Sequence, residues 1–379
     1  MSEWKTYKLG ELVTFQRGHD LTRNQMQEGI YPVAGSNGVI GYHNEFTTKA
    51  PSITIGRSGN IGNAYFFDKD FWAHNTTLYI KEFKNCDPKF IYYLLQTMNF
   101  GGHNSGSAVP SLNRNYIHPI EVKAPNIETQ RQIAQILTSL DDKIELNLQM
   151  NQTLEAMAQA IFKEWFVNFN FPGFDGELVD GLPKGWRKGK LGDIIDVKGG
   201  TTPSTSVDEY WNGENYWTTP KDLSNAQSPV LIDTERKITD LGVKQISSGV
   251  LPKGTLLLSS RAPIGYLAIS QVPISINQGY VAIQGKAVSN LFMLFWLKEN
   301  MEAVKSKANG STFQEISKSN FKLIDISIPS VEVLQRFDEV IDPVFRKIVE
   351  NVYSNLSLTQ TRDTLLPKLM SGQLKVSEL

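Results

Sequence analysis

The sequence predicts an α+β protein in which two similar mixed α/β domains are joined by two long antiparallel helices, a coiled-coil spacer, with a pseudo-twofold internal repeat. Three observations predict it: a repeat within the chain, short β-prone runs beside a helical run in each copy, and a long heptad pattern after each copy. With 379 residues, 40% of them hydrophobic and 20% charged, the chain is long enough for two or more cored domains and is neither disordered nor collagen-like.

The repeat is visible at two anchors. Residues 8–12 (KLGEL) return as 190–194 (KLGDI), and residues 106–125 (GSAVPSLNRNYIHPIEVKAP) align without gaps to 310–329 (GSTFQEISKSNFKLIDISIP). The offset rises from 182 to 204, so the 22 extra residues lie within the globular part of the second copy. Between the anchors, RSGNIG at Arg57 resembles RAPIG at Arg261 with one gap, and Asn75 falls near Asn277.

Each globular copy is predicted to mix strands and helices. Short β-prone runs bounded by Gly, Asn and Asp predict strands at 52–56, 64–67, 76–80, 255–258 and 280–283. Pro88 at a plausible first helical position predicts a helix over 88–99, and the apolar run 291–301 predicts its counterpart.

A heptad pattern follows each copy and predicts a helix too long to be an ordinary surface helix. The helix needs a partner to bury its seam, and the obvious partner is the other copy. The seam positions are Ile133, Leu137, Leu140, Ile144, Asn147, Asn151, Leu154, Ala158, Ile161 and Trp165 in the first helix, and Phe337, Ile341, Val344, Ile348, Asn351, Asn355, Leu358, Arg362, Leu365 and Leu369 in the second.

Asparagines occupy the middle of both seams. If the helices are antiparallel, Asn147 faces Asn355 and Asn151 faces Asn351, and such amide pairs fix register at some cost in stability. The alternative is that these positions are solvated and the helices splay there. Proline predicts a kink or a start of the second helix at residue 343 and its end at residue 367.

These patterns divide the chain into six segments. We expect a first domain over 1–125, a central spacer helix over 126–170, a linker over 171–185, a second domain over 186–330, a distal spacer helix over 331–370 and a C-terminal tail over 371–379. A single cysteine excludes an intramolecular disulfide, the N-terminus lacks the features of a signal peptide, and no apolar run is long enough to span a bilayer. We therefore expect a cytoplasmic protein that does not associate with membranes.

The sequence contains no recognisable catalytic or metal-binding motif. No P-loop or dinucleotide fingerprint occurs, and the five histidines, all in the first copy, lack ligand spacing. Glu121 and Lys123 have the E-x-K spacing of nucleases, but the counterpart 325–327 lacks the lysine, which favours an edge strand. The Asn-Pro-Pro-aromatic motif of adenine methyltransferases is absent, and Cys86 has no evident partner. We expect no catalytic residue, no metal site and no cofactor in this chain.

The charges are distributed unevenly along the chain, although the net charge is close to zero. The net charge of -1 argues against a strongly basic nucleic-acid binder. However, residues 1–125 carry 12 basic and 10 acidic residues and 181–330 carry 17 and 13, whereas 126–180 carry 3 and 9 and 331–379 carry 6 and 7. The domains are basic and the helices acidic, which raises the case for nucleic-acid binding slightly.

Several segments resemble those of a known family. Residues 139–169 (SLDDKIELNLQMNQTLEAMAQAIFKEWFVNF) and 364–374 (TLLPKLMSGQL) look like the two conserved regions of type I restriction-modification specificity subunits. Blocks that are similar to that family's target recognition domains are PVAGSNGVIGY at 32–42, IGRSGNIGNAYFF at 55–67, GGTTPSTSVDEYW at 199–211 and LLSSRAPIG at 257–265.

The resemblance implies a DNA-recognition subunit without catalysis of its own. Each recognition domain would read one half of a bipartite target in double-stranded DNA, and the helices would set the spacer between the halves. Two modification subunits, which bind S-adenosylmethionine and methylate adenine, would dock on the subunit. Restriction subunits, which use ATP and Mg, would join for translocation and cleavage.

Base reading needs hydrogen-bonding side chains on exposed loops, with basic residues on phosphates. The candidates in the first copy are Ser36, Asn37, Arg57, Ser58, Asn60, Asn113 and Arg114. Those in the second copy are Thr202, Ser204, Thr219, Lys221, Arg261, Asn277 and Gln278. For each of them, the alternative is a turn residue that bonds its own backbone.

Two alternative functions are less consistent with the sequence. An autonomous methyltransferase or nuclease is opposed by the missing methyl-donor site and the missing Asn-Pro-Pro-aromatic motif. A structural coiled-coil scaffold is opposed by the divergence of the polar, loop-rich domains beside more similar helices.

Overall fold

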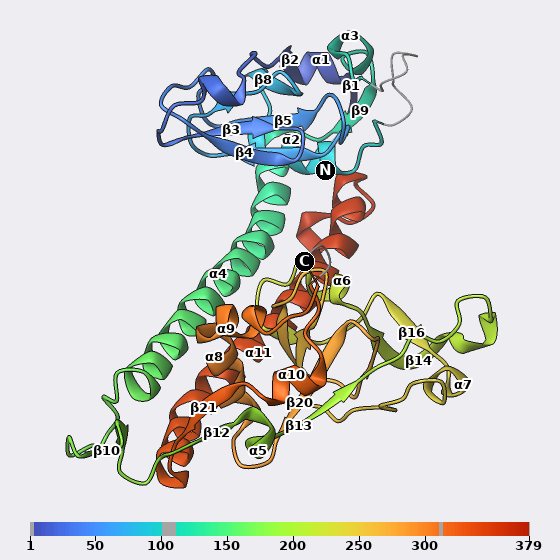
Figure 1. The fold of residues 1–379 in the computed structure, drawn as a ribbon. Helices are drawn as coiled ribbons and strands as arrows, with labels where there is room; N and C mark the ends of the chain where they lie inside the picture. The colour runs from blue at the N-terminus through green and yellow to red at the C-terminus, as the bar shows by residue number, and fades with distance from the viewer. Residues whose placement is uncertain (1–3, 101–110, 311–313, 379) are drawn as a thin grey trace. The chain divides into compact units, whose positions relative to one another are not determined.

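The computed structural model describes residues 4–100, 111–310 and 314–378. The chain divides into two compact units, Met1–Ile144 with Ser357–Leu379 (unit 1) and Glu145–Leu356 (unit 2). Two 40-residue helices, α4 (Ile127–Phe166) and α11 (Val331–Met370), each contribute one part to unit 1 and the other to unit 2 (Figure 1). Residues 106–110 and 311–313 of the repeat segments, and His103, lie outside the described residues.

Unit 1 contains the first copy of the repeat. Its other elements are β1 (Lys5–Lys8), α1 (Leu9–Leu12), β2 (Val13–Arg17), η1 (Arg23–Gln25), β3 (Tyr31–Gly35), β4 (Gly38–His43), β5 (Ser52–Gly56), β6 (Ala64–Phe67), β7 (Trp72–Ala73), β8 (Thr77–Phe83), α2 (Pro88–Gln96), α3 (Arg114–Ile117), β9 (Glu121–Ala124) and η3 (Val376–Glu378). The strands form three sheets with the orders β2-β8-β5-β6, β4-β3-β7 and β1-β9.

Unit 2 contains the second copy. Its other elements are β10 (Leu178–Val179), β11 (Leu182–Pro183), β12 (Arg187–Lys190), α5 (Leu191–Ile194), β13 (Ile195–Gly199), η2 (Asp208–Tyr210), β14 (Trp211–Thr218), α6 (Pro220–Leu223), β15 (Val230–Leu231), β16 (Arg236–Ile238), α7 (Asp240–Val243), β17 (Leu256–Ser259), β18 (Leu267–Ser270), β19 (Ser275–Ile276), β20 (Tyr280–Gly285), α8 (Asn290–Glu299), α9 (Met301–Ser306), α10 (Lys318–Lys322) and β21 (Asp325–Ile328). Its principal sheets have the orders β13-β20-β17-β18-β15, β16-β14-β19 and β12-β21.

The two copies share one topology, which confirms the predicted repeat. Strand β2 pairs antiparallel with β8 as β13 pairs with β20, and the short parallel pair β3·β7 recurs as β14·β19. Ala34 pairs with Ala73 as Thr218 pairs with Ile276. The offset is 184 residues from Ala34 to Thr218 and 203 residues from Ala73 to Ile276. Most of the extra length of the second copy therefore lies between β14 and β17, where α6, β15, β16 and α7 are found.

The cores explain why these segments fold as predicted. Helix α2 opens with Pro88 at its first position, the Asp87 side chain accepts a hydrogen bond from the Phe90 N–H at 2.9 Å, and Phe90 is fully buried. Every side chain from Phe292 to Leu297 in α8 is buried, as expected of a helix that is apolar on all sides. The predicted strands at 52–56 and 64–67 match β5 and β6.

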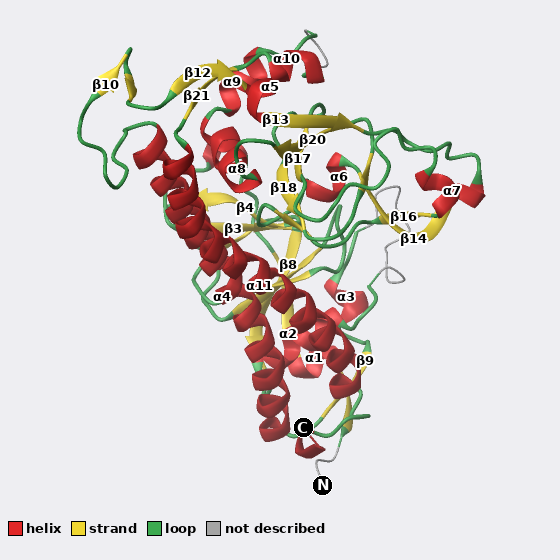
Figure 2. Ribbon diagram, turned by 90° about the horizontal axis from the view of Figure 1, so that it is seen from below, coloured by secondary structure: helices red, strands yellow, loops and turns green. Residues whose placement is uncertain are grey.

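The long helices pack antiparallel and lie side by side in Figure 2. The Asn147 amide donates to the Asn355 carbonyl oxygen at 2.8 Å, and the Asn351 amide donates to the Asn151 carbonyl oxygen at 2.8 Å. Asn147 and Asn151 are each only 1% exposed, which opposes the alternative of solvated, splayed positions. Whether these pairs fix the register stays a prediction.

The proline predictions were partly wrong. Helix α11 already begins at Val331 and continues through Pro343 and Pro367 to Met370. Pro343 therefore does not start the helix and Pro367 does not end it. Buried Ile341 and Phe345 flank Pro343, and buried Leu369 and Met370 follow Pro367, so packing of the apolar face outweighs the lost backbone hydrogen bonds.

One seam position is charged in unit 1 only. The Arg362 guanidinium donates to Asp141 Oδ1 at 2.8 Å, and the Tyr93 hydroxyl donates to Asp141 Oδ2 at 2.7 Å. At the repeat offset of 204, the counterparts of Asp141 and Arg362 are Phe345 and Ala158, both in the buried core of unit 2. The repeat thus retains the shared strand pairings but not the chemistry of its seam.

Candidate nucleic-acid interface

Four loop segments converge at the same place in each unit. In unit 1 they are the segments after β2, β5 and β7 and the segment before α3. In unit 2 they are the segments after β13, β17 and β19 and the segment before α10. The backbone hydrogen bonds that join them in unit 1 are His19 N–H to Ala73 O (2.7 Å), Arg57 N–H to Thr76 O (2.8 Å) and Leu112 N–H to Arg57 O (2.8 Å). Those in unit 2 are Thr201 N–H to Ile276 O (3.1 Å), Ser260 N–H to Gly279 O (2.8 Å) and Ile316 N–H to Ser260 O (3.0 Å).

These hydrogen bonds correct two pairings proposed from sequence. Arg57 is equivalent to Ser260, because both accept from the segment before the short helix, and Arg261 is equivalent to Ser58. Asn75 is equivalent to Gln278 rather than to Asn277. The sequence comparison paired residues of the same type, Arg57 with Arg261 and Asn75 with Asn277. The backbone hydrogen bonds show that the equivalent residues are one position away from those pairings.

A pocket of about 600 Å³ in unit 1 brings together Arg57, Asn113 and Arg114 from the predicted set. Arg17 and His19 line it too, and neither was predicted from the sequence. Asn113 also caps α3, since its side-chain oxygen accepts from the Asn115 N–H at 3.0 Å. The arginine and amide side chains that line this recess provide the donors that phosphates and base edges accept.

The remaining predicted residues of unit 1 lie on two adjoining loops. Ser36 and Asn37 form the two-residue turn between β3 and β4, and exposed Asn60 lies in the loop after β5. Gly56 has no room for a side chain, because a Cβ there would lie 1.7 Å from the Asn60 carbonyl oxygen and 3.3 Å from that of Ser36. Ser58 forms an isolated bridge with Ser111.

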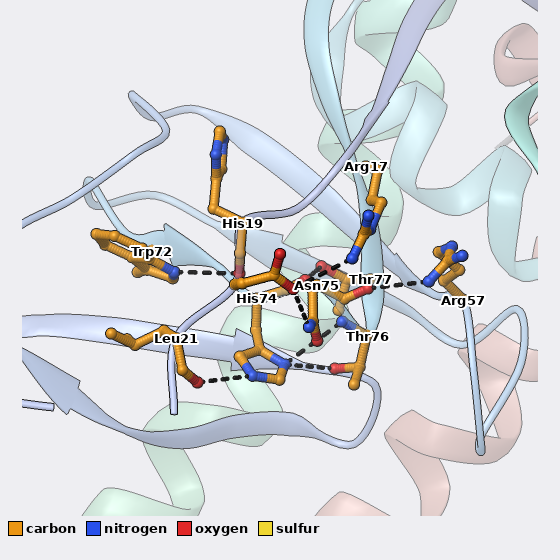
Figure 3. A network of polar contacts seen from close by, with 10 residues as sticks. Arg17, His19, Leu21, Arg57, Trp72, His74, Asn75, Thr76 and Thr77 are labelled. Carbon is orange, nitrogen blue, oxygen red and sulfur yellow. Dashed lines mark hydrogen bonds and ion pairs between the residues drawn. The ribbon is translucent and has the colours of Figure 1, made fainter. Parts of the chain in front are cut away.

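A polar network holds the loop after β7 (Figure 3). His74 Nε2 lies 3.1 Å from the Leu21 carbonyl oxygen, and its Nδ1 lies 2.9 Å from the Thr76 hydroxyl. Arg57 Nη1 donates to the Asn75 carbonyl oxygen at 3.3 Å. The side-chain amide of Asn75 donates to the Asp20 carboxylate, which Arg17 also contacts at 3.1 Å.

The Asp20 carboxylate stays ionised at neutral pH. The hydrogen bond from Asn75, followed by the nearby charge of Arg17, holds the pKa of Asp20 below its ordinary value. It can therefore act only as an acceptor toward Asn75.

In unit 2 the structure gathers part of the predicted set. The Thr202 hydroxyl donates to the Gln278 side-chain oxygen at 2.6 Å, and the Asn277 N–H donates to the Thr218 carbonyl beside Thr219. Thr219 is the N-cap of α6, and its N–H donates to Asp222 at 2.7 Å.

The other three predicted residues of unit 2 have local partners. Lys221 forms an ion pair with Glu235 at 2.8 Å, Arg261 lies 3.7 Å from Glu315, and the Ser204 hydroxyl lies 2.8 Å from that of Ser206. Ion pairs as exposed as that of Lys221 contribute little stability, so such a side chain can exchange its partner for a phosphate.

Lys318 is a functional candidate that residue-type reasoning missed. It is the ungapped counterpart of Arg114, and its amino group lies 3.1 Å from where a Cβ on Gly199 would be. Gly199 is the counterpart of Arg17 in the strand ladder. One cation thus covers in unit 2 the place that two arginines share in unit 1, and the ungapped alignment already contained that signal.

Other candidate chemistry is not supported. Burial raises the pKa of the Cys86 thiol to about 11, and its Sγ donates to the Leu12 carbonyl at 3.2 Å, so it is not a thiolate nucleophile. Glu121 and Lys123 lie in β9, and β1 is the only strand that pairs with β9 among the described residues. In the described ranges no three His, Cys, Asp or Glu side chains are grouped to hold a metal ion. No helix there has the length and apolar composition that a bilayer crossing requires.

Two repeated α/β units with a polar, cation-bearing loop surface define a modular recognition protein, and comparison with known proteins identifies the class. The chain belongs to the family of type I restriction modification DNA specificity domains, whose model matches residues 1–156 and 183–360. It is a specificity subunit that recognises DNA sequence, and catalysis in such systems lies in other subunits.

Individual relatives agree with this assignment. The HindI specificity subunit of Haemophilus influenzae is 25% identical over 99% of this chain and 100% of its own. The MjaIX specificity subunit of Methanocaldococcus jannaschii is 43% identical over 45% of this chain, a match that spans only 40% of that relative. The solved S subunit from M. genitalium shares the fold, with a TM-score of 0.65 and 18% identity over 97% of this chain and 96% of that one.

Proposed function

We propose that the chain reads a bipartite site in double-stranded DNA, with one half read by each unit. The supporting observation is that the same four-segment surface recurs in both units with different side chains, so that equivalent surfaces would read different sequences. The residues proposed for DNA contact are those predicted from sequence, with Arg17, Asn75 and Lys318 added.

The long helices would set the unspecified spacer between the two half-sites. A 40-residue helix is about 60 Å long, and recognition modules commonly bind half-sites one DNA turn, about 34 Å, apart. We retain residues 1–125 and 186–330 as recognition domains and 126–170 and 331–370 as spacer helices within this proposal.

The partners follow from the same proposal. Two modification subunits would dock on the chain and supply S-adenosylmethionine, and restriction subunits would supply the chemistry of ATP and Mg. We expect such an assembly in the cytoplasm, where it meets DNA. This chain would contribute the DNA contacts, the spacer and the docking surface for its partners.

Purified chain and purified modification subunit, each alone and then mixed, test the proposal. Incubation with S-adenosylmethionine and DNA should give sequence-specific adenine methylation in the mixture and none with this chain alone. Methylation or cleavage by the chain without any partner would show an autonomous enzyme instead.

A further inference from the structure

Both units build the same tight loop after their short parallel strand. In unit 1 the Thr76 N–H donates to His74 Nδ1 at 3.4 Å, and in unit 2 the Gly279 N–H donates to the Asn277 side-chain oxygen at 2.8 Å. Such side-chain-to-backbone bonds across two residues fix the residue between them. That middle residue is a carboxamide in both units, Asn75 and Gln278.

The middle carboxamide has an equivalent inner partner in each unit. Asn75 bonds Asp20, three residues beyond the end of β2, and Gln278 bonds Thr202, three residues beyond the end of β13. The geometry is retained although both residue types differ. A contact that recurs while its chemistry changes is what two modules reading different sequences would show.

The inner partner decides which face of the amide points outward. The Asp20 carboxylate accepts only, so it binds the amide nitrogen of Asn75 and leaves the carbonyl oxygen available. The Thr202 hydroxyl donates to the carbonyl oxygen of Gln278 and leaves the amide nitrogen available. Within the described ranges no hydrogen bond occupies the Asn75 side-chain oxygen or the Gln278 side-chain nitrogen, and Gln278 is exposed.

We propose that Asn75 and Gln278 each read one base pair with opposite hydrogen-bond polarity, because Asp20 bonds the amide nitrogen of Asn75 and Thr202 bonds the amide oxygen of Gln278. The Asn75 oxygen accepts from an exocyclic amino group, which adenine and cytosine display in the major groove. The Gln278 amide donates to a carbonyl oxygen, which guanine and thymine display there. This inference rests on the proposed function and adds to it the residues that determine specificity.

The surroundings suit a base contact flanked by phosphate contacts. In unit 1, Arg17 lies 3.1 Å from Asp20, and Arg57 bonds the backbone of Asn75. In unit 2, Lys318 lies beside Gly199 near the start of the Thr202 loop. Cations beside each amide can bind the DNA backbone and hold the base edge within reach.

The test exchanges the inner partner and maps methylated sites. Thr202→Asp, in full chain assembled with the modification subunit, forces Gln278 to turn its nitrogen inward and its oxygen outward. We expect the preference at one base pair of one half-site to change from guanine or thymine to adenine or cytosine, with the other half unchanged. Asp20→Thr should relax the preference for an amino group in the other half, because a hydroxyl can either donate to the Asn75 oxygen or accept from its nitrogen.

Two further variants keep the inference falsifiable if a partner exchange prevents folding. Gln278→Glu keeps the Thr202 bond, removes the outward donor and should also favour an amino group at that base pair. Gln278→Ala should abolish discrimination there, a loss of roughly 5- to 150-fold for one base contact. Gln227→Ala removes an exposed carboxamide elsewhere in unit 2 that is not among the proposed DNA contacts, so it is the control and should leave the recognised site unchanged.

The possible outcomes distinguish failure of this inference from failure of the proposed DNA-recognition function. If Gln278→Glu, Gln278→Ala and Asn75→Ala assemblies all methylate the wild-type site with wild-type selectivity, the inference is overturned while DNA recognition stands. If the unsubstituted assembly shows no sequence-specific methylation, the proposed function itself fails before any variant is compared.

Discussion

Asn351 donates its side-chain amide hydrogen to the Asn151 carbonyl oxygen at 2.8 Å, and both side chains are at least 97% buried in the seam between α4 and α11. A second bond runs from the Asn151 amide to the Ile348 carbonyl at 3.3 Å. Both hydrogen bonds form within unit 2, so replacement of one asparagine leaves the buried side-chain amide of the other without that partner.

Asn151→Leu should destabilise the protein by about 1–3 kcal/mol, because the Asn351 amide is left buried without its acceptor. The Asn151→Leu/Asn351→Leu double variant should recover most of that loss, since both polar groups are then replaced by apolar ones. Chemical denaturation of the two single variants and the double variant measures the coupling. Equal stability of the single and double variants would contradict the pairing.

Replacing all four seam asparagines with leucine should leave a folded protein, with a changed register if the amides specify it. Asn147 favours this outcome, because its carbonyl oxygen is buried without a hydrogen-bond partner in the described part of the chain. Crosslinking between cysteines introduced across the seam would report the register. Complete loss of folding would refute the account of the seam.

Asp141→Ala should lower the free energy of unfolding by about 1–3 kcal/mol, because Arg362 loses an ion-pair partner that is about 70% buried. Thr138 lies 3.4 Å from the Tyr93 hydroxyl and can accept its hydrogen instead, so the loss comes mainly from Arg362. Asp141→Asn, which keeps an acceptor, should lose less. Wild-type stability of Asp141→Ala in urea denaturation would show that the ion pair is unimportant.

Acidification should destabilise unit 1 through His118. Its Nε2 accepts the Phe15 N–H at 3.0 Å, and burial, followed by Arg114 and Lys84, lowers its pKa below the ordinary value of 6.5. As pH falls through 6.5, the unfolded chain binds the proton first, so stability that is present above that pH is lost below it.

His118→Gln, whose side-chain oxygen can still accept from Phe15, should lose less stability between pH 7.5 and 5.5 than the wild type does. Thermal unfolding at the two pH values measures this, and His19→Gln removes a histidine without touching this bond. An identical loss in the wild type and His118→Gln would exclude the role given to His118.

Arg57→Ala and Arg261→Ala should each weaken DNA binding of the assembly and reduce the slope of log affinity against log salt by about 1, as expected for one lost phosphate contact. Arg131→Ala removes an exposed charge from α4, paired with Glu128 at 3.9 Å, and serves as the control. Unchanged affinity and salt dependence in both interface variants would show that the two arginines do not contact DNA.

The sequence predicted what local pattern determines. Strands β5 and β6, the start of α2 and the two heptad helices follow from turn residues, capping and periodicity. The short elements α6, β15, β16 and α7 were not predicted, because two to four residues are too few for a periodic pattern.

The site was less predictable than the fold. The equivalence of Arg57 with Ser260, and the contacts of Asp20 with Asn75 and of Thr202 with Gln278, depend on strand register and on residues far apart in the chain. The ion pair between Asp141 and Arg362 could not be predicted, because the heptad pattern indicates which positions are buried but not whether a charged side chain has a partner there.

Mapping every methylated adenine produced by the chain with its modification subunit on random DNA tests the central claim most directly. The account predicts a target of two short specific halves separated by an unspecified gap of fixed length. A continuous recognition sequence, or methylation without sequence preference, would contradict it.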